Sequence, residues 1–200
     1  MRMQIVVYDG FDELDALAPL EVLRRAAELG ADLAVELVTL APCNEVKASF
    51  GLRLRPDGVL DPDAPPDLLL VPGGGWNVGG QTGVRAEIAR GELPATIAQL
   101  HTRGTLIATV CTGAMLAAAA GLTSGRHATT HAAALGALRE SGADVPAVRV
   151  VDDGDLISAG GITSGLDLAL WLVERFFGPK LACAIERRME YERRGSVWRE

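Results

Sequence analysis

The chain has 200 residues, which fits one ordinary domain and is long enough to bury a core that needs no disulfide or metal. Hydrophobic residues make up 48% of it and charged residues 22%, which indicates a globular protein and argues against disorder. With 19 basic and 26 acidic residues the net charge is −7, which disfavours a nucleic-acid-binding surface.

Cysteine content and hydropathy indicate in which cellular compartment the protein resides. Three cysteines exclude a disulfide framework and predict a reducing, cytoplasmic location. The N-terminal apolar run is too short for a signal peptide, and no uninterrupted apolar run reaches the roughly 18 residues of a membrane span. We therefore expect no membrane association.

Short apolar runs alternate with amphipathic stretches along the whole chain, a pattern that predicts an α/β fold with a parallel sheet covered by helices on both faces. The predicted strands are 4–8, 33–40, 67–71, 105–110, 148–152 and 155–159, the last two forming a hairpin around Asp153-Gly154. The predicted helices are 19–29, 92–103, 112–120, 132–141, 163–177 and 179–191. The segment 41–66 predicts loops with a short hairpin around 51–55. With no linker or repeat, one domain over 1–200 is expected.

Cys111 stands between a predicted buried strand and a predicted helix, in the segment TVCTGA (109–114). A sharp strand-to-helix turn would push its side chain out over the carboxyl edge of the sheet, as in a nucleophile elbow. The start of the helix would favour thiolate over thiol. Alternatively, the cysteine is an inert buried residue, which is common for this residue type.

A glycine turn, PGGG (72–75), follows another predicted strand. Glycine is needed where backbone N–H groups must approach a ligand or an oxyanion without interference from side chains. These groups could face the Thr112 N–H across Cys111, although a plain flexible turn gives the same pattern. The spacing matches no nucleotide-binding loop.

Three acidic residues, Asp12, Glu13 and Asp15, fall in what we predict to be the loop after the first strand. A carboxyl beside a cysteine can accept and donate a proton, whereas acids before a helix can instead complement its dipole. Spacing alone does not choose among the three.

The remaining candidates are histidines and cysteines. His131 lies 20 residues beyond Cys111 and could approach it, while His101 and His127 are interpreted as surface residues. We interpret Cys43 and Cys183 as packing or surface residues. Because no CxxC, HExxH or similar ligand spacing occurs, neither a metal nor another cofactor is expected.

Together, VPGGG (71–75), ATVCTGA (108–114), GRHATTH (125–131) and ISAGGITSGLDLALWLVER (157–175) resemble the DJ-1/PfpI (ThiJ/PfpI) superfamily over nearly the whole chain. The resemblance implies a flavodoxin-like three-layer sandwich with a mostly parallel central sheet, similar to class I glutamine amidotransferases, and usually a homodimer.

The first-loop segment indicates one branch of that superfamily. Leu14, Asp15 and Pro19 fit the Leu-Asp-x-x-x-Pro pattern of the isonitrile hydratase branch, in which an Asp replaces the usual Glu. The resemblance implies Cys111 as nucleophile, Asp15 beside it as general acid and base, and Thr112 as a hydroxyl that supports the carboxyl. Thr112 also stands where the protease branch has a His, which argues against a peptidase.

The same resemblance assigns further positions. It implies that Gly74, Gly75 and His131 contribute to an oxyanion or substrate site, and that Trp76 fills one wall of it. Ala132-Ala133-Ala134 stand where the family often has a bulky aromatic, which predicts either a roomier pocket or a different substrate.

The expected activity is addition of water to an isonitrile, giving an N-substituted formamide by way of a thioimidate on Cys111. Two alternatives remain. One is a ligand or redox sensor related to the amidase-like domain of AraC-type regulators, whose DNA-reading part the chain, ending at Glu200, is expected to lack. The other is a glyoxalase or deglycase.

Overall fold

The computed structural model describes residues 1–77 and 79–199, and its framework is an eight-stranded sheet in the order β10-β8-β9-β7-β6-β1-β2-β5. The strands are β1 (Arg2–Val6), β2 (Ala34–Thr39), β3 (Val46–Lys47), β4 (Arg53–Leu54), β5 (Gly58–Val59), β6 (Leu68–Val71), β7 (Leu106–Val110), β8 (Val150–Asp153), β9 (Leu156–Ala159) and β10 (Val197–Arg199). Neighbours in the sheet run parallel except β8 and β9, while β3 and β4 form a separate antiparallel hairpin.

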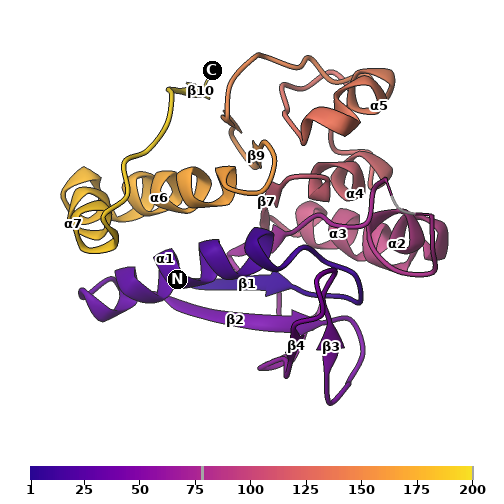
Figure 1. The fold of residues 1–200 in the computed structure, drawn as a ribbon, viewed down its shortest axis with the longest axis horizontal. Coiled ribbons are helices and arrows are strands. Elements are labelled where there is room, and N and C mark those ends of the chain that lie inside the picture. The colour runs from indigo at the N-terminus through magenta and orange to yellow at the C-terminus, as the bar shows by residue number, and fades with distance from the viewer. Residues whose placement is uncertain (78, 200) are drawn as a thin grey trace.

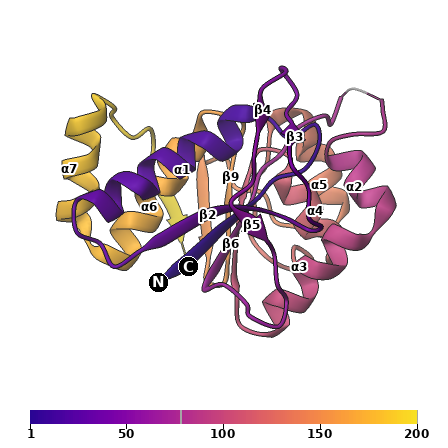
Figure 2. The same cartoon turned by 90° about the horizontal axis from the view of Figure 1, so that it is seen from below.

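Helices cover both faces of this sheet (Figure 1). They are α1 (Glu13–Glu28), α2 (Val84–Arg90), α3 (Glu92–Thr102), α4 (Gly113–Ala119), α5 (Leu135–Glu140), α6 (Ser164–Phe177) and α7 (Pro179–Met189), with a 3-10 turn η1 (Ala132–Ala134) before α5. Figure 2 shows α1, α6 and α7 on one side of the strands and α2 to α5 on the other. The predicted α/β sandwich with a mostly parallel sheet is confirmed.

The core follows from the sequence pattern of the central strands. Every residue of β6 is buried, as are the residues of β7 after Leu106, because a parallel strand covered on both faces needs a continuous apolar run. The five adjacent strands β9, β7, β6, β1 and β2 run in one direction. Their carboxyl ends therefore meet at one edge, which is where ligand sites of such sheets form.

Several predicted boundaries are wrong. The first helix begins at Glu13 and passes through Pro19, so Glu13 and Asp15 lie in its first turn and not in a loop. Pro19 is the seventh residue of this helix, beyond the first turn, so its missing N–H removes the helical hydrogen bond to the Asp15 carbonyl.

Three elements were not predicted, and one turn is displaced. The helix α2 is seven residues long, too short for a clear apolar period. The strand β5 has two residues and pairs with β2, and β10 has three residues and pairs with β8. Residues 190–199 thus continue beyond the last helix. The hairpin turn between β8 and β9 lies at Gly154-Asp155, one residue later than predicted.

No helix within residues 1–77 and 79–199 is long and apolar enough to cross a membrane.

Candidate active site at the Cys111 elbow

Cys111 occupies a tight turn between β7 and α4, with a left-handed backbone φ of 57° and only 6% of its surface exposed. Its N–H donates to the carbonyl oxygens of Ala159 and Gly160, at 3.1 and 3.0 Å, and its own carbonyl accepts the Thr130 hydroxyl at 2.8 Å. A non-glycine residue in this conformation is strained, and such bonds must hold it. The elbow predicted from the sequence is therefore present.

Gly113, two residues after Cys111, stands at a position where only glycine fits. A Cβ on Gly113 would lie 2.1 Å from the Val71 carbonyl oxygen, so only glycine lets α4 begin this close to the end of β6. This close approach brings the Cys111 turn against the glycine turn that follows β6.

Asp15 is the carboxyl that faces the thiol. It is fully buried in the first turn of α1, where one oxygen, Oδ2, accepts the Gly73 N–H at 3.0 Å. Its other oxygen, Oδ1, is buried without a hydrogen-bond partner within residues 1–77 and 79–199, and the Cys111 thiol lies close enough to affect the pKa of the carboxyl. Loops from two strand ends and the first turn of one helix thus converge on a single carboxyl–thiol pair.

Burial dominates the electrostatics of this pair. It raises the pKa of Asp15 to about 7, helped by the neighbouring charge of Asp12 and opposed by the Gly73 N–H and by Cys111. A carboxyl with a pKa near neutrality can both hold and release a proton under ordinary conditions, which suits general acid–base chemistry.

The expectation that the helix start favours a thiolate is wrong for this structure. Burial and then the Asp15 carboxylate raise the pKa of Cys111 to about 12, while the Ile162 and Thr112 N–H groups lower it by less. The helix α4 has only seven residues and the sulfur is nearly dry, so loss of hydration outweighs the helix dipole. The proton therefore rests on the sulfur at neutral pH.

Ile162 is a site residue that the sequence analysis missed. It has a left-handed φ of 48°, its N–H lowers the pKa of the Cys111 thiol, and the residue is 37% exposed. The Gly160-Gly161 pair before it was the available signal, since such a pair often precedes an unusual backbone turn.

The glycine turn is arranged differently from the prediction. Gly74 donates its N–H to the Thr112 hydroxyl at 3.1 Å, so this N–H is not available to an oxyanion. In this bond the Thr112 hydroxyl is the acceptor, and Gly73 supplies the backbone N–H on Asp15. Whether the Thr112 hydroxyl also supports the carboxyl stays a prediction. A Cβ on Gly73 would lie 2.5 Å from both N and Oγ1 of Thr112, which explains the need for glycine.

The three acidic residues have three different contacts. Asp12 caps α1 by accepting the Leu14 N–H at 3.2 Å. Glu13 reaches the β3–β4 hairpin, where its Oε1 accepts the N–H groups of Phe50 and Leu52. Only Asp15 faces the thiol, so the structure separates residues that spacing could not distinguish.

His131 lies beside the site but is engaged locally. Its Nδ1 accepts the Ala133 N–H at 3.1 Å, and its ring packs so closely on Gly161 that a Cβ there would lie 2.3 Å from Cδ2. Burial raises the pKa of Asp12, and the charge of His131 opposes this, so His131 lies near the start of α1. Whether it takes part in chemistry stays a prediction.

Gly75 and Trp76 follow the turn toward α2. A Cβ on Gly75 would lie 3.0 Å from the Gly83 Cα, so this glycine packs on the loop before α2. The Trp76 ring lies under the Arg85 guanidinium at 4.0 Å. A cavity of about 470 Å³ borders Gly75, Asp12 and other nearby residues. The predicted substrate-binding roles of Gly75 and Trp76 remain predictions.

The other cysteines and histidines lie elsewhere. Cys43 and Cys183 are exposed, as the surface interpretation predicted. His101 pairs with Asp155 at 3.0 Å, and His127 stacks on Trp198. Within the described ranges no group of three or more His, Cys, Asp or Glu residues could hold a metal ion.

The sequence pattern of the DJ-1/PfpI family matches residues 1–175. The chain belongs to the DJ-1/PfpI family. It is 33% identical over 195 residues to the isonitrile hydratase of Pseudomonas putida, a match that covers 96% of this chain and 79% of that protein. It is also 33% identical over 184 residues to the HTH-type transcriptional regulator CdhR of Pseudomonas aeruginosa, covering 88% of this chain but about half (51%) of the regulator.

Solved structures of the DJ-1/PfpI family have the same fold. A mutant of a DJ-1 superfamily protein from Salmonella typhimurium superposes with a TM-score of 0.81 at 25% identity, covering 96% of this chain and 98% of that one. An AraC family transcriptional regulator from Pseudomonas putida superposes with a TM-score of 0.79 at 23% identity, covering 94% and 98%. This second likeness concerns the fold alone. The relatives that this chain resembles in sequence thus include an enzyme and a transcriptional regulator.

Proposed function

We propose that this DJ-1/PfpI protein is a cysteine-dependent hydratase that adds water to an isonitrile and releases an N-substituted formamide. The observation that carries the proposal is the buried pair of Cys111 thiol and Asp15 carboxyl, in which the pKa of the carboxyl is raised to about 7. The 33% identity to an isonitrile hydratase supports the choice of substrate class.

The first half-reaction joins the sulfur to the terminal carbon of the isonitrile. Because burial raises the pKa of Cys111 to about 12, the thiol must lose its proton as it attacks, and Asp15 is the base in contact with it. Asp15 then gives that proton to the same carbon, which yields a thioimidate, R–N=CH–S–Cys111. The Ile162 and Thr112 N–H groups stabilise negative charge on the sulfur during this step.

The second half-reaction consumes one water molecule. Asp15 removes a proton from the water as its oxygen bonds to the thioimidate carbon, and it passes that proton to the nitrogen. The carbon–sulfur bond then breaks, the hydroxyl proton of the adduct passes by way of Asp15 to the sulfur, and R–NH–CHO leaves. The sum is one isonitrile plus one water giving one formamide, with Cys111 and Asp15 restored.

A substrate panel with matched variants tests the proposal. The wild-type chain should convert aliphatic and aromatic isonitriles to formamides, and Cys111→Ala should abolish turnover while circular dichroism shows an unchanged fold. Cys183→Ala, an exposed cysteine away from the elbow, is the control and should keep full activity. Full turnover by Cys111→Ala would overturn the proposal.

The same panel separates the rival functions. Turnover of methylglyoxal without turnover of isonitriles would favour a glyoxalase or deglycase. The likeness to regulators favours a ligand-sensing role as the second candidate. Redox sensing is less favoured, because burial raises the pKa of Cys111 and a protonated thiol is oxidised slowly by peroxide.

The family resemblance further implies a homodimer, which light scattering would detect.

A further inference from the structure

A second cavity, of about 530 Å³, lies next to the backbone that holds Cys111 but is not lined by Cys111 or Asp15. Two of its lining residues, Thr130 and Gly160, each hydrogen-bond the Cys111 main chain. Its volume falls within the usual range for small-molecule sites, which is roughly 300 to 1,000 Å³. The proposed hydration reaction makes no use of this space.

One wall of the cavity is apolar. Leu135 from α5 and the loop residues Val145, Pro146 and Val148 line it, and each is only half-buried. Half-buried aliphatic side chains around a concave space leave apolar surface that a ligand could cover, with a gain of about 25 cal/mol for each Å² removed from water. The ligand should therefore have an apolar body.

The polar groups of the cavity favour an anion. Arg139 and Arg149 line it, and no Asp or Glu does so among the residues that the structure describes, although the chain as a whole carries a net charge of −7. The Arg149 guanidinium is bound by Asp167, at 2.8 and 2.7 Å. Arg139, in contrast, has no carboxylate within salt-bridge distance in the described part of the chain.

Ser164 supplies a second polar group. It is only 2% exposed and it lines the cavity. Its hydroxyl can therefore donate a hydrogen bond to a ligand atom inside the cavity.

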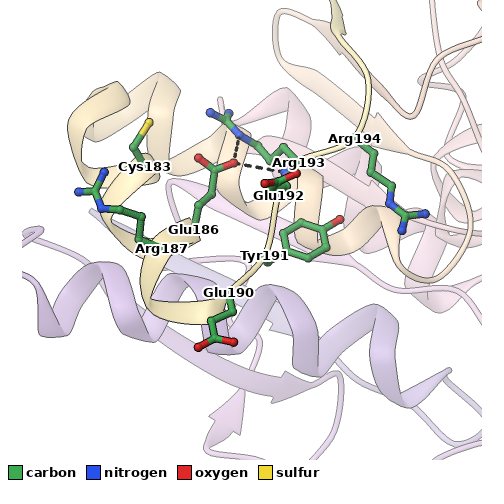
Figure 3. A pocket seen from close by; sticks show the side chains of 8 residues that line it. All are labelled: Cys183, Glu186, Arg187, Glu190, Tyr191, Glu192, Arg193 and Arg194. Atoms are coloured by element: carbon green, nitrogen blue, oxygen red, sulfur yellow. Dashed lines mark hydrogen bonds and ion pairs between the residues drawn. The ribbon is translucent and has the colours of Figure 1, made fainter.

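The C-terminal segment closes the remaining side through Gly195 and Ser196. Figure 3 shows the residues just before them, where Arg193 bonds Glu186 at 2.9 Å on α7. Arg193 also bonds Glu174 at 2.6 Å on α6, and the Arg194 N–H donates to Asp167 at 2.9 Å. These contacts fix the segment in place, so the cavity has a fixed wall on this side.

We propose that this cavity is a second ligand site that binds a small organic carboxylate with an apolar body. The carboxylate pairs with Arg139, the apolar body covers Leu135 and Val148, and Ser164 donates a hydrogen bond to an acceptor on the ligand. Arginine binds carboxylates with two parallel hydrogen bonds, which gives the site its preference for the anion over a neutral analogue.

The test uses benzoate and hexanoate as probes, with benzamide as the neutral analogue of benzoate. Binding is followed by calorimetry and by the backbone NMR signals of Gly160, Gly161 and Gly195 on the full chain. We expect saturable binding of the carboxylates, with benzamide binding at least about tenfold more weakly. The shifted signals should be those of the cavity.

Variants then locate the site. Arg139→Gln should weaken carboxylate binding by about tenfold or more. Arg187→Gln removes the same charge from an exposed position of α7 outside the cavity and should leave binding unchanged (Figure 3). Ala147→Trp, at an exposed position of the lining, should fill the cavity and block binding without touching either guanidinium.

The result that would overturn the inference is binding equal in Arg139→Gln and Arg187→Gln, or no saturable binding up to the solubility limit of either probe. Cys111→Ala keeps this test separate from the hydratase proposal, because the variant should lose turnover and still bind benzoate. Loss of benzoate binding in Cys111→Ala would place the probe at the thiol and would also overturn the second site.

Discussion

Two buried aspartates stand in the first turns of two helices that pack against each other, Asp15 of α1 and Asp167 of α6, and their surroundings are opposite. Asp15 accepts one backbone N–H and lies beside the Cys111 thiol, and within residues 1–77 and 79–199 no cation is paired with it. Asp167 is bound by the Arg149 guanidinium, the Tyr191 hydroxyl at 3.0 Å and the Arg194 N–H.

The difference separates a carboxyl that can exchange a proton near neutral pH from one that is held by a guanidinium and two further donors. A buried carboxyl without a cation takes up a proton more readily, because the charged form loses its hydration and gains little in return. A guanidinium and two further donors remove that cost, and the carboxylate then organises the chain around it. The burial of an acidic residue therefore does not identify a catalytic group until its partners are counted.

The largest expected effect is on turnover in Asp15→Asn. Asparagine keeps the shape and can still accept the Gly73 N–H, but it can neither take the thiol proton nor return it. We expect kcat for isonitrile hydration to fall by about 10²- to 10⁴-fold. The measurement is formamide release, with Glu13→Gln as the matched control on the same helix start, because Glu13 contacts Phe50 and Leu52 and not Asp15. Unchanged kinetics in Asp15→Asn would reduce Asp15 to an acid that merely begins a helix.

The second prediction concerns stability against pH. The unfolded chain releases the Asp15 proton near the ordinary pKa of 3.8, whereas the folded chain keeps it until the raised pKa of about 7. Between these two pH values the folded chain binds more protons than the unfolded chain, so the free energy of unfolding falls as the pH rises. Above pH 7 the contribution of Asp15 to this fall reaches about 4 kcal/mol.

Urea unfolding of wild type and Asp15→Asn at a series of pH values measures this effect. The difference between the two curves isolates Asp15 from all other titrating groups, and the variant should become the more stable of the two on going from about pH 4 to pH 7. A constant difference over that range would mean that the pKa of Asp15 is not raised.

The strands and the elbow were predictable because their signals are local. The buried runs of β6 and β7 and the glycines after them mark where each strand ends, and the Cys111 turn follows directly. The start of α1 was also predictable in principle. Asp12 as N-cap with Glu13 and Asp15 after it is a helix-start pattern, and the presence of Pro19 obscured it.

The proton balance of the site was not predictable in the same way. The pKa of Cys111 depends on how completely the sulfur is buried and on the Asp15 charge beside it, and neither can be obtained from neighbours in sequence. The Gly73 and Ile162 N–H donors come from turns after β6 and β9, which meet only because the sheet places those strands on either side of β7. Such groups become visible once the sheet order is known.

The third prediction makes the same Asp-to-Asn change at Asp167, the aspartate that is bound by Arg149. Asp167→Asn should lower the free energy of unfolding by roughly 3 kcal/mol, since it leaves the Arg149 guanidinium without its charge partner. The expected loss of stability is at the low end for a buried ion pair because the Arg149 side chain is 31% exposed, so water can solvate the unpaired guanidinium. Turnover per folded molecule should not change.

Chemical unfolding with a parallel activity assay measures both quantities at once. The double variant Arg149→Met with Asp167→Asn should recover part of the lost stability, because the unpaired guanidinium is then gone. If Asp167→Asn instead lowered kcat in the folded fraction, the division between a proton-carrying and a structural aspartate would fail.

The smallest effect tests how the glycine turn holds Asp15 in position. Thr112→Val removes the oxygen that accepts the buried Gly74 N–H and leaves that donor without a partner, at a cost of about 1 to 2 kcal/mol in the free energy of unfolding. Thr112→Ser keeps the acceptor and should retain most of the stability. Because Gly73 and Gly74 are consecutive, a loosened Gly74 also loosens the N–H on Asp15, and kcat in Thr112→Val should fall less than in Asp15→Asn. Equal losses of stability in the Val and Ser variants would show that the Thr112 methyl group, not its hydroxyl, fixes the turn, and Asp15 would then depend on packing alone for its position.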